Sequence, residues 1–187
     1  MKEFYEMEIA GLKRKLPLCK INDELYIAAF IMFGDVEMTI ECARELLKKA
    51  PEFDIMITAE SKGIPLLYEM SRQAGLNDYI VARKGPKLYM KNVTFTHVNS
   101  ITTDHQQVLC VGQDEIDKIK GKRVLIVDDV ISTGESLKAL EVLVEKVGGN
   151  IVGKMAVLAE GEAIEREDIT VLEHLPLFDT NGEPKNN

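Results

Sequence analysis

The chain contains no tryptophan and only three cysteines and three histidines among its 187 residues. Cys19, Cys42 and Cys110 are odd in number and widely spaced, which argues against a disulfide framework and against a zinc site. The three histidines show no metal-ligand spacing either. These shortages predict a protein of a reducing compartment that has no metal centre built from its own side chains.

Long apolar runs and an excess of positive charge are also missing. The longest uncharged apolar stretch, Leu25–Phe33, has nine residues, whereas roughly 20 are needed to cross a bilayer. The first residues, MKEFYEMEIAGLKRK, mix acids and bases and contain no apolar signal segment. The net charge of −8 argues against a nucleic-acid partner, which normally meets a basic surface. We therefore expect a cytoplasmic protein with no membrane span and no nucleic-acid partner.

Short apolar runs do alternate with amphipathic stretches along the chain. The apolar runs predict strands at Asp54–Thr58, Asp78–Ala82, Arg123–Val127 and Ile151–Leu158. Apolar residues at three- and four-residue steps predict helices at Val36–Lys49, with Asp35 as its N-cap, at Ile64–Gln73 and at Glu135–Val147. This alternation indicates an α/β fold, a parallel sheet with helices on both faces, and the length fits one domain over residues 1–187.

The segment Val124–Ser136, VLIVDDVISTGES, carries the strongest chemical signal. Asp128 and Asp129 follow the apolar strand, and ligands of parallel sheets bind beyond the carboxyl ends of strands. Carboxylates are good acceptors for the vicinal hydroxyls of a ribose, whereas hydroxyls and a glycine at a helix start can bind phosphate. The residues expected to hold phosphate are Ser132, Thr133, Gly134, Glu135 and Ser136. Either half alone is equally well explained as an ordinary strand end or helix cap, but together they predict a site for a sugar phosphate.

The order and spacing of this segment resemble the phosphoribosyl pyrophosphate motif of the type I phosphoribosyltransferases. The resemblance implies the parallel-sheet fold of that family, with a small hood formed by residues 1–35 and 159–178. It also implies that Asp128 and Asp129 contact the ribose hydroxyls and that the loop after them holds the 5-phosphate. The polar composition of residues 179–187 predicts a tail that frays.

Two further segments resemble parts of the same family. The turn after DIMITA looks like its pyrophosphate loop, which implies ligand contacts from Glu60, Ser61, Lys62 and Gly63. The run VARKGPKL resembles the basic loop of the purine branch, in which Arg83, Lys84 and Lys87 would face the leaving pyrophosphate. Taken alone, each segment is also ordinary turn chemistry.

The resemblance implies transfer of ribose phosphate from phosphoribosyl pyrophosphate to a purine through a cationic, oxocarbenium-like sugar. Magnesium bound with the pyrophosphate would neutralise the leaving group, and Arg83 would assist it. The expected catalytic residues are Asp128, Asp129 and Arg83. The resemblance also implies a homodimer.

The choice of purine is signalled less consistently. Phe33, in FGDV, resembles the residue that stacks on the base in adenine phosphoribosyltransferases, although Gly34 replaces the arginine usual there. The excursion Asn92–Gly112, with Val98, Ser100 and Thr102 in HVNSITT, looks more like the loop of xanthine phosphoribosyltransferases.

The region around Glu160 favours adenine. Ala159–Gly161 falls where xanthine enzymes carry Glu-Lys, so the lysine expected to meet an oxopurine is absent. Glu160 is an acceptor when ionised and would receive the exocyclic N–H₂ of adenine, although it reads equally as a solvated surface acid. We favour adenine, with xanthine, or hypoxanthine and guanine, as alternatives.

Two other classes of protein compete with this assignment. A phosphoribosyltransferase-like regulator would keep the sugar-phosphate site as a sensor, but the 35 residues before the first predicted helix leave little room for a DNA-binding domain. A magnesium-dependent receiver or phosphatase also uses paired acids at a strand end, but this class does not explain the Ser-Thr-Gly-Glu-Ser loop.

Overall fold

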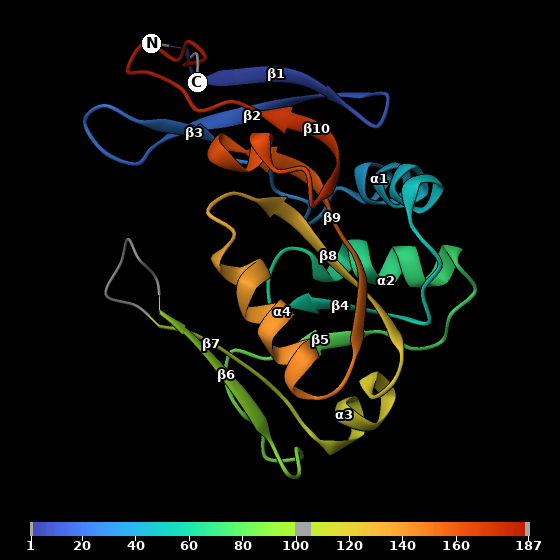
Figure 1. The fold of residues 1–187 in the computed structure, drawn as a ribbon. Coiled ribbons are helices and arrows are strands. Elements are labelled where there is room, and N and C mark those ends of the chain that lie inside the picture. The colour runs from blue at the N-terminus through green and yellow to red at the C-terminus, as the bar shows by residue number, and fades with distance from the viewer. Residues whose placement is uncertain (1, 100–105, 186–187) are drawn as a thin grey trace.

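A computed structural model describes residues 2–99 and 106–185, without the side chains of residues 98, 99, 106 and 107. Its centre is a sheet of five strands in the order β10-β9-β8-β4-β5, and every neighbouring pair is parallel (Figure 1). The strands are β4 Ile55–Ala59, β5 Ile80–Ala82, β8 Arg123–Ile131, β9 Asn150–Glu160 and β10 Thr170–Leu175. The predicted α/β class with a parallel sheet is confirmed.

Helices cover both faces of this sheet because alternate strand residues point to opposite sides. In β8, Leu125 and Val127 pack into one apolar cluster with α1 and α2, whereas Val124 and Ile126 join a second cluster with α3 and α4. The helices are α1 Val36–Lys49, α2 Ile64–Gln73, α3 Gln113–Ile119 and α4 Glu135–Lys146, with a 3-10 turn η1 at Gly161–Glu165. In the described ranges, none of the helices is both long enough and apolar enough to pass through a membrane.

The first two helices match their predicted bounds. Asp35 caps α1, and its Oδ1 accepts the Met38 N–H over 3.0 Å. Pro65 occupies the first turn of α2, where its missing N–H costs no intrahelical hydrogen bond. Caps and an apolar stripe are local signals, so these helices can be predicted from the sequence.

The N-terminal residues form a second, antiparallel sheet above the end of the central sheet (Figure 1). Its strands are β1 Phe4–Ile9, β2 Leu12–Lys20 and β3 Tyr26–Ala28. Phe178, which is fully buried, exchanges two backbone hydrogen bonds of 2.9 Å with Tyr26. The C-terminal part of the expected hood therefore reaches this sheet at Phe178, whereas β10 within it is an edge strand of the central sheet.

Residues 179–185, part of the segment expected to fray, form a turn against the N-terminus. Asp179 Oδ1 accepts the N–H groups of Asn181 and Glu183 over 2.8 and 2.9 Å. The Lys2 N–H donates to the Asn181 carbonyl over 3.2 Å, and Lys2 Nζ also pairs with Glu183. Polar groups of this segment thus form hydrogen bonds that the sequence alone does not predict.

A hairpin of β6 Thr94–Asn99 and β7 Gln106–Val111 lies over α4 (Figure 1). Arg83, just after β5, exchanges backbone hydrogen bonds of 2.9 and 2.8 Å with Cys110 in β7. The described part of the long excursion therefore contains an antiparallel strand pair that is joined to the end of β5.

The position of the site follows from where the strand order reverses. β4 and β5 run to one edge of the sheet, and the chain then returns to place β8 on the other side of β4. The register between β4 and β8 ends at Ile57 and Ile126, but β8 continues beside β9 through Asp128 and Ile131. The predicted end of this strand at Val127 is therefore wrong. Asp128 and Asp129 lie within β8, beyond the last of its residues that pairs with β4.

Candidate active site

Two buried acids mark the carboxyl end of β8. The exposed fractions of Asp128 and Asp129 are only 8% and 4%. The Asp129 N–H donates to Asp128 Oδ1 over 2.9 Å, and the Ser61 hydroxyl donates to the same oxygen over 3.3 Å. Burial, and then the adjacent Asp129 carboxylate, raise the pKa of Asp128. Such acids are costly to bury and are typical of functional sites.

The loop between β4 and α2 lies against these acids. Lys62 Nζ forms an ion pair with Asp129 Oδ2 at 2.9 Å and donates to the Phe30 carbonyl, also over 2.9 Å. The Gly63 N–H donates to Ser61 Oγ over 3.2 Å, which orders the turn. Because β4 and β8 are neighbours in the sheet, two predicted ligand segments that lie far apart in the sequence meet here.

The loop between β8 and α4 encloses a cavity of about 120 Å³, lined by Asp128 and residues Val130–Leu137. All of the predicted phosphate-binding residues, Ser132–Ser136, belong to this lining. Gly134 is the N-cap of α4 and has a φ of +78°. The first-turn N–H groups of a helix lack intrahelical acceptors, so this cavity has donors suited to an anion.

We expect Gly134→Ala to weaken binding of ribose 5-phosphate roughly tenfold. A side chain in this left-handed conformation costs about 1–2 kcal/mol, and the new Cβ would lie 2.7 Å from Arg166 Nη1. Isothermal titration calorimetry measures the affinity. Gly121→Ala is the matched control, because Gly121 has a similar φ of +73° with nothing within 4 Å of its Cβ position. Equal affinities in the two variants would contradict a role for Gly134 in the anion site.

The three predicted basic residues gather around one carboxylate. Arg83 Nη2 and Lys87 Nζ lie 3.6 and 3.8 Å from Glu60 Oε1, and the Lys84 N–H donates to Glu60 Oε2 over 3.0 Å. The Lys84 hydrogen bond, followed by the cations, lowers the pKa of Glu60. Arg83 Nε is buried and has no hydrogen-bond partner among the described residues. Glu60, expected to contact ligand, therefore also fixes the basic loop beside the turn after β4.

The two residues predicted to meet the base occupy different elements. Glu160 ends β9 and is partly buried, which raises its pKa, whereas the Ser132 hydroxyl and the charge of Lys62 act in the opposite direction. Phe33 is 59% exposed and lies on the segment between β3 and α1, whose Phe30 carbonyl accepts from Lys62. Lys62 thus lies near both of the structural elements proposed to hold the base.

Residues 100–105, in the middle of the loop that resembles the xanthine enzymes, lie outside the described residues. Ser100 and Thr102 are not among them, and Val98 lies in β6 without a described side chain. The comparison between the adenine-like and xanthine-like loops therefore stays a prediction.

Thr58 is a buried polar residue beside the candidate site that sequence reasoning missed. Its side chain is fully buried, and its hydroxyl has no hydrogen-bond partner within the part of the chain that the structure describes. This hydroxyl lies 2.8 Å from the position that a Cβ on Gly63 would occupy, and Asp128 Oδ1 lies 3.0 Å from the same point. The available signal was a single hydroxyl at the end of the apolar strand IMITA.

The fold and these side chains define a type I phosphoribosyltransferase. The model of the phosphoribosyl transferase domain family matches residues 38–184, so the chain belongs to that family and the family prediction is confirmed. The assignment to the transferases, as opposed to a receiver or phosphatase, is confirmed with it.

Within this family, the chain is similar to proteins named adenine phosphoribosyltransferase. Adenine phosphoribosyltransferase of Acetivibrio thermocellus is 32% identical over 155 residues, covering 79% of this chain and 84% of that protein. The enzyme of the same name from Petrotoga mobilis is 33% identical over 140 residues, covering 72% and 74%. The crystal structure of adenine phosphoribosyltransferase from Thermoanaerobacter pseudethanolicus has a similar fold, with a TM-score of 0.65 at 20% identity over 92% of this chain and 95% of that one.

Proposed function

We propose that this chain transfers the 5-phosphoribosyl group of phosphoribosyl pyrophosphate to adenine and releases AMP and pyrophosphate, a reaction of purine salvage. The observation that carries the proposal is the meeting of three parts at one edge of the sheet. These are the buried acid pair, the cavity of the β8–α4 loop and the turn that holds Lys62. The relatives named adenine phosphoribosyltransferase support adenine as the acceptor.

Each part of the site has a proposed role in the reaction. The β8–α4 loop binds the 5-phosphate, and Asp128 and Asp129 accept the ribose hydroxyls and stabilise positive charge at C1 as its bond to pyrophosphate breaks. Lys62 and Arg83, with the rest of the basic loop, bind the leaving pyrophosphate. Adenine N9 forms the new bond to C1, and its proton is lost.

Magnesium fits this arrangement as a substrate-bound ion. Among the described residues there is no group of three or more histidines, cysteines or acids that could hold a metal ion by themselves. Mg²⁺ usually keeps several waters and is bound by one or two carboxylates together with substrate phosphates. Asp128 and Asp129 are the residues that would hold it, and the ion would neutralise the pyrophosphate charge.

Adenine would be held between an aromatic ring and an acceptor. Phe33 offers an exposed ring for stacking. Glu160, when ionised, accepts hydrogen bonds only and so suits the exocyclic N–H₂ of adenine better than the carbonyl of an oxopurine.

We further propose that the chain acts as a single cytoplasmic domain in a homodimer. An apolar groove of about 440 Å³ between α1 and α2 supports the dimer, because it is bordered by exposed apolar side chains. The most exposed of these are Val36 at 69% and Tyr68 at 54%.

The test is an assay of the purified chain with phosphoribosyl pyrophosphate, Mg²⁺ and each of adenine, hypoxanthine, guanine and xanthine. We expect AMP and pyrophosphate in equal amounts with adenine and little nucleotide with the other bases. Turnover with oxopurines alone would overturn the choice of adenine. Binding of phosphoribosyl pyrophosphate without release of pyrophosphate with any base would indicate a regulator.

A further inference from the structure

The segment Ala29–Asp35 joins β3 to α1 and carries Phe33; we name it the base strap. Its side chains alternate between the core and the surface. Phe30 and Met32 are 3% and 1% exposed, whereas Ile31 and Phe33 are 53% and 59% exposed. The two buried residues anchor the strap in the core and leave the ring of Phe33 on the open side.

The start of the strap is held by two hydrogen bonds to other elements. The Ala29 N–H donates to the Pro17 carbonyl over 2.9 Å, and the Phe30 carbonyl accepts from Lys62 Nζ over 2.9 Å. Because Lys62 also pairs with Asp129, it connects this end of the strap to the acid pair.

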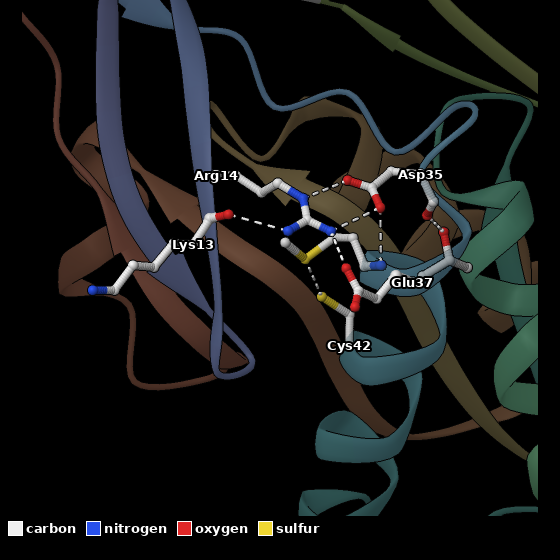
Figure 2. Close-up of polar contacts among 7 residues, drawn as sticks. Lys13, Arg14, Asp35, Glu37 and Cys42 are labelled. Carbon is white, nitrogen blue, oxygen red and sulfur yellow. Dashed lines mark hydrogen bonds and ion pairs between the residues drawn. The ribbon is translucent and has the colours of Figure 1, made fainter.

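The other end of the strap is held by Arg14 from β2. Figure 2 shows the Arg14 guanidinium facing the Asp35 carboxylate, with Nε to Oδ2 at 2.7 Å and Nη2 to Oδ1 at 3.1 Å. Nη2 also donates to Glu37 Oε2 over 2.8 Å, and Nη1 donates to the Lys13 carbonyl over 3.1 Å. A two-point contact between planar groups fixes orientation as well as distance.

Asp35 transmits this restraint to the helix as well as to the strap. Its Oδ1 accepts the Met38 N–H while its own carbonyl accepts the Thr39 hydroxyl over 2.8 Å. The hydrogen bond from Arg14 keeps the pKa of Asp35 below its usual value, despite partial burial. Gly34, with a φ of +84° and no Cβ, contributes no side-chain restraint of its own next to Phe33. The Arg14 contact thus adds a side-chain anchor on the C-terminal side of the ring, where the Asp35 N–H also donates to the Met32 carbonyl over 3.1 Å.

We propose that Arg14 is a positioning residue for the purine: by holding Asp35, it sets where Phe33 meets the base. This inference rests on the proposed function, because Phe33 is assigned to the base there. Arg14 does not act on the ribose phosphate or on pyrophosphate, whose ligands lie at the ends of β4, β5 and β8.

Replacing Arg14 by glutamine should separate the two substrates kinetically. We expect Arg14→Gln to raise the KM for adenine about tenfold, because a charge-assisted two-point contact is lost. The kcat and the KM for phosphoribosyl pyrophosphate should stay within about twofold of the original values. Arg14→Lys keeps the charge without the planar fork and should restore part of the affinity for adenine.

The control is Lys15→Gln, which removes a charge from the same strand and an exposed ion pair with Glu6 at 2.9 Å but no contact to the strap. An adenine KM unchanged in Arg14→Gln, or an equal rise for both substrates, would overturn the positioning role.

Amide hydrogen exchange without ligand tests the anchor independently of the reaction. The amide of Asp35, which donates to the Met32 carbonyl over 3.1 Å, should exchange several-fold faster in Arg14→Gln than in Lys15→Gln, since the strap loses one of its fixed ends. Equal exchange in the two variants would overturn the anchor itself. If the unmodified protein turns over no purine, the proposed function fails, whereas the exchange result still decides whether Arg14 holds the strap.

Discussion

Replacing Asp128 and Asp129 together by asparagine should abolish phosphoribosyl transfer while leaving the protein folded. Both side chains lie in β8 beyond its last pairing with β4, are almost fully buried, and contact Ser61 and Lys62 in the turn after β4. Asparagine preserves the shape and an acceptor oxygen, but it removes the negative charge that would stabilise a cationic sugar. We expect kcat to fall by at least about a thousandfold, the range found when preorganised electrostatic groups are removed.

The same acids should cost the protein stability, and Asp128 gives that cost a defined pH dependence. Its raised pKa means that the folded chain keeps the Asp128 proton at a pH where the unfolded chain has lost it. The free energy of unfolding therefore falls as the pH rises from about 4, the ordinary aspartate value, through the raised pKa. Asp128→Asn removes this loss and should be the more stable protein at pH 8 by on the order of 1 kcal/mol, or roughly 2–4 °C in melting temperature.

Thermal melts between pH 4 and pH 8, together with the pyrophosphate assay, check both halves of this prediction. Asp54→Asn is the control, since Asp54 precedes β4 at the opposite end of the sheet and pairs with Arg123 at 2.9 Å. That variant should lose a little stability and keep its turnover. Near-normal turnover in the double variant would remove the acids from the mechanism, and a melting difference that does not grow with pH would contradict the burial cost of Asp128.

The parts of the fold that the sequence predicted are those with local signals. The helix Val36–Lys49 has a capping side chain and a complete apolar stripe, and the apolar run that becomes β4 is buried at every position. The predicted end of β8 is too early because the apolar run stops at Val127, whereas backbone pairing with β9 continues and does not depend on side-chain polarity. The hairpin β6–β7 has no strong apolar alternation and is held by contacts distant in sequence, such as Lys146 Nζ to the Phe95 carbonyl at 2.8 Å.

The candidate site divides in the same way. The phosphate loop could be predicted because its glycine, its hydroxyl residues and the start of the helix are contiguous in the sequence. The contact between Lys62 and Asp129 depends on β4 and β8 being neighbours, which strand order along the chain does not reveal. Arg14 was missed for the same reason, since nothing near it in the sequence indicates that β2 lies beside the N-terminus of α1.

Among the substitutions that add a single methyl group, we expect Gly63→Ala to cause the largest loss of activity. Gly63 has an ordinary φ of −70°, so alanine adds no backbone strain there. The added Cβ would lie 2.8 Å from the Thr58 hydroxyl oxygen and 3.0 Å from Asp128 Oδ1, and both of these side chains are buried. Neither neighbour is the free end of a flexible surface chain, so the turn and the acid must move apart.

A displacement of about 1 Å at a reacting group can cost about a hundredfold in rate, and we expect a loss of that size in kcat for Gly63→Ala. Overpacking by itself costs about 1–3 kcal/mol of stability, so the control must share that cost without moving the acids. Gly153→Ala meets this requirement, because its Cβ would lie 2.9 Å from Leu125 Cδ1 and 3.0 Å from Pro51 Cγ. Leu125 lies in β8 three residues before Asp128. Melting temperatures should fall in both variants, whereas kcat should fall only in Gly63→Ala. A parallel fall of kcat in both would show that general loosening of the sheet, and not the placement of Asp128 against the turn after β4, limits the reaction.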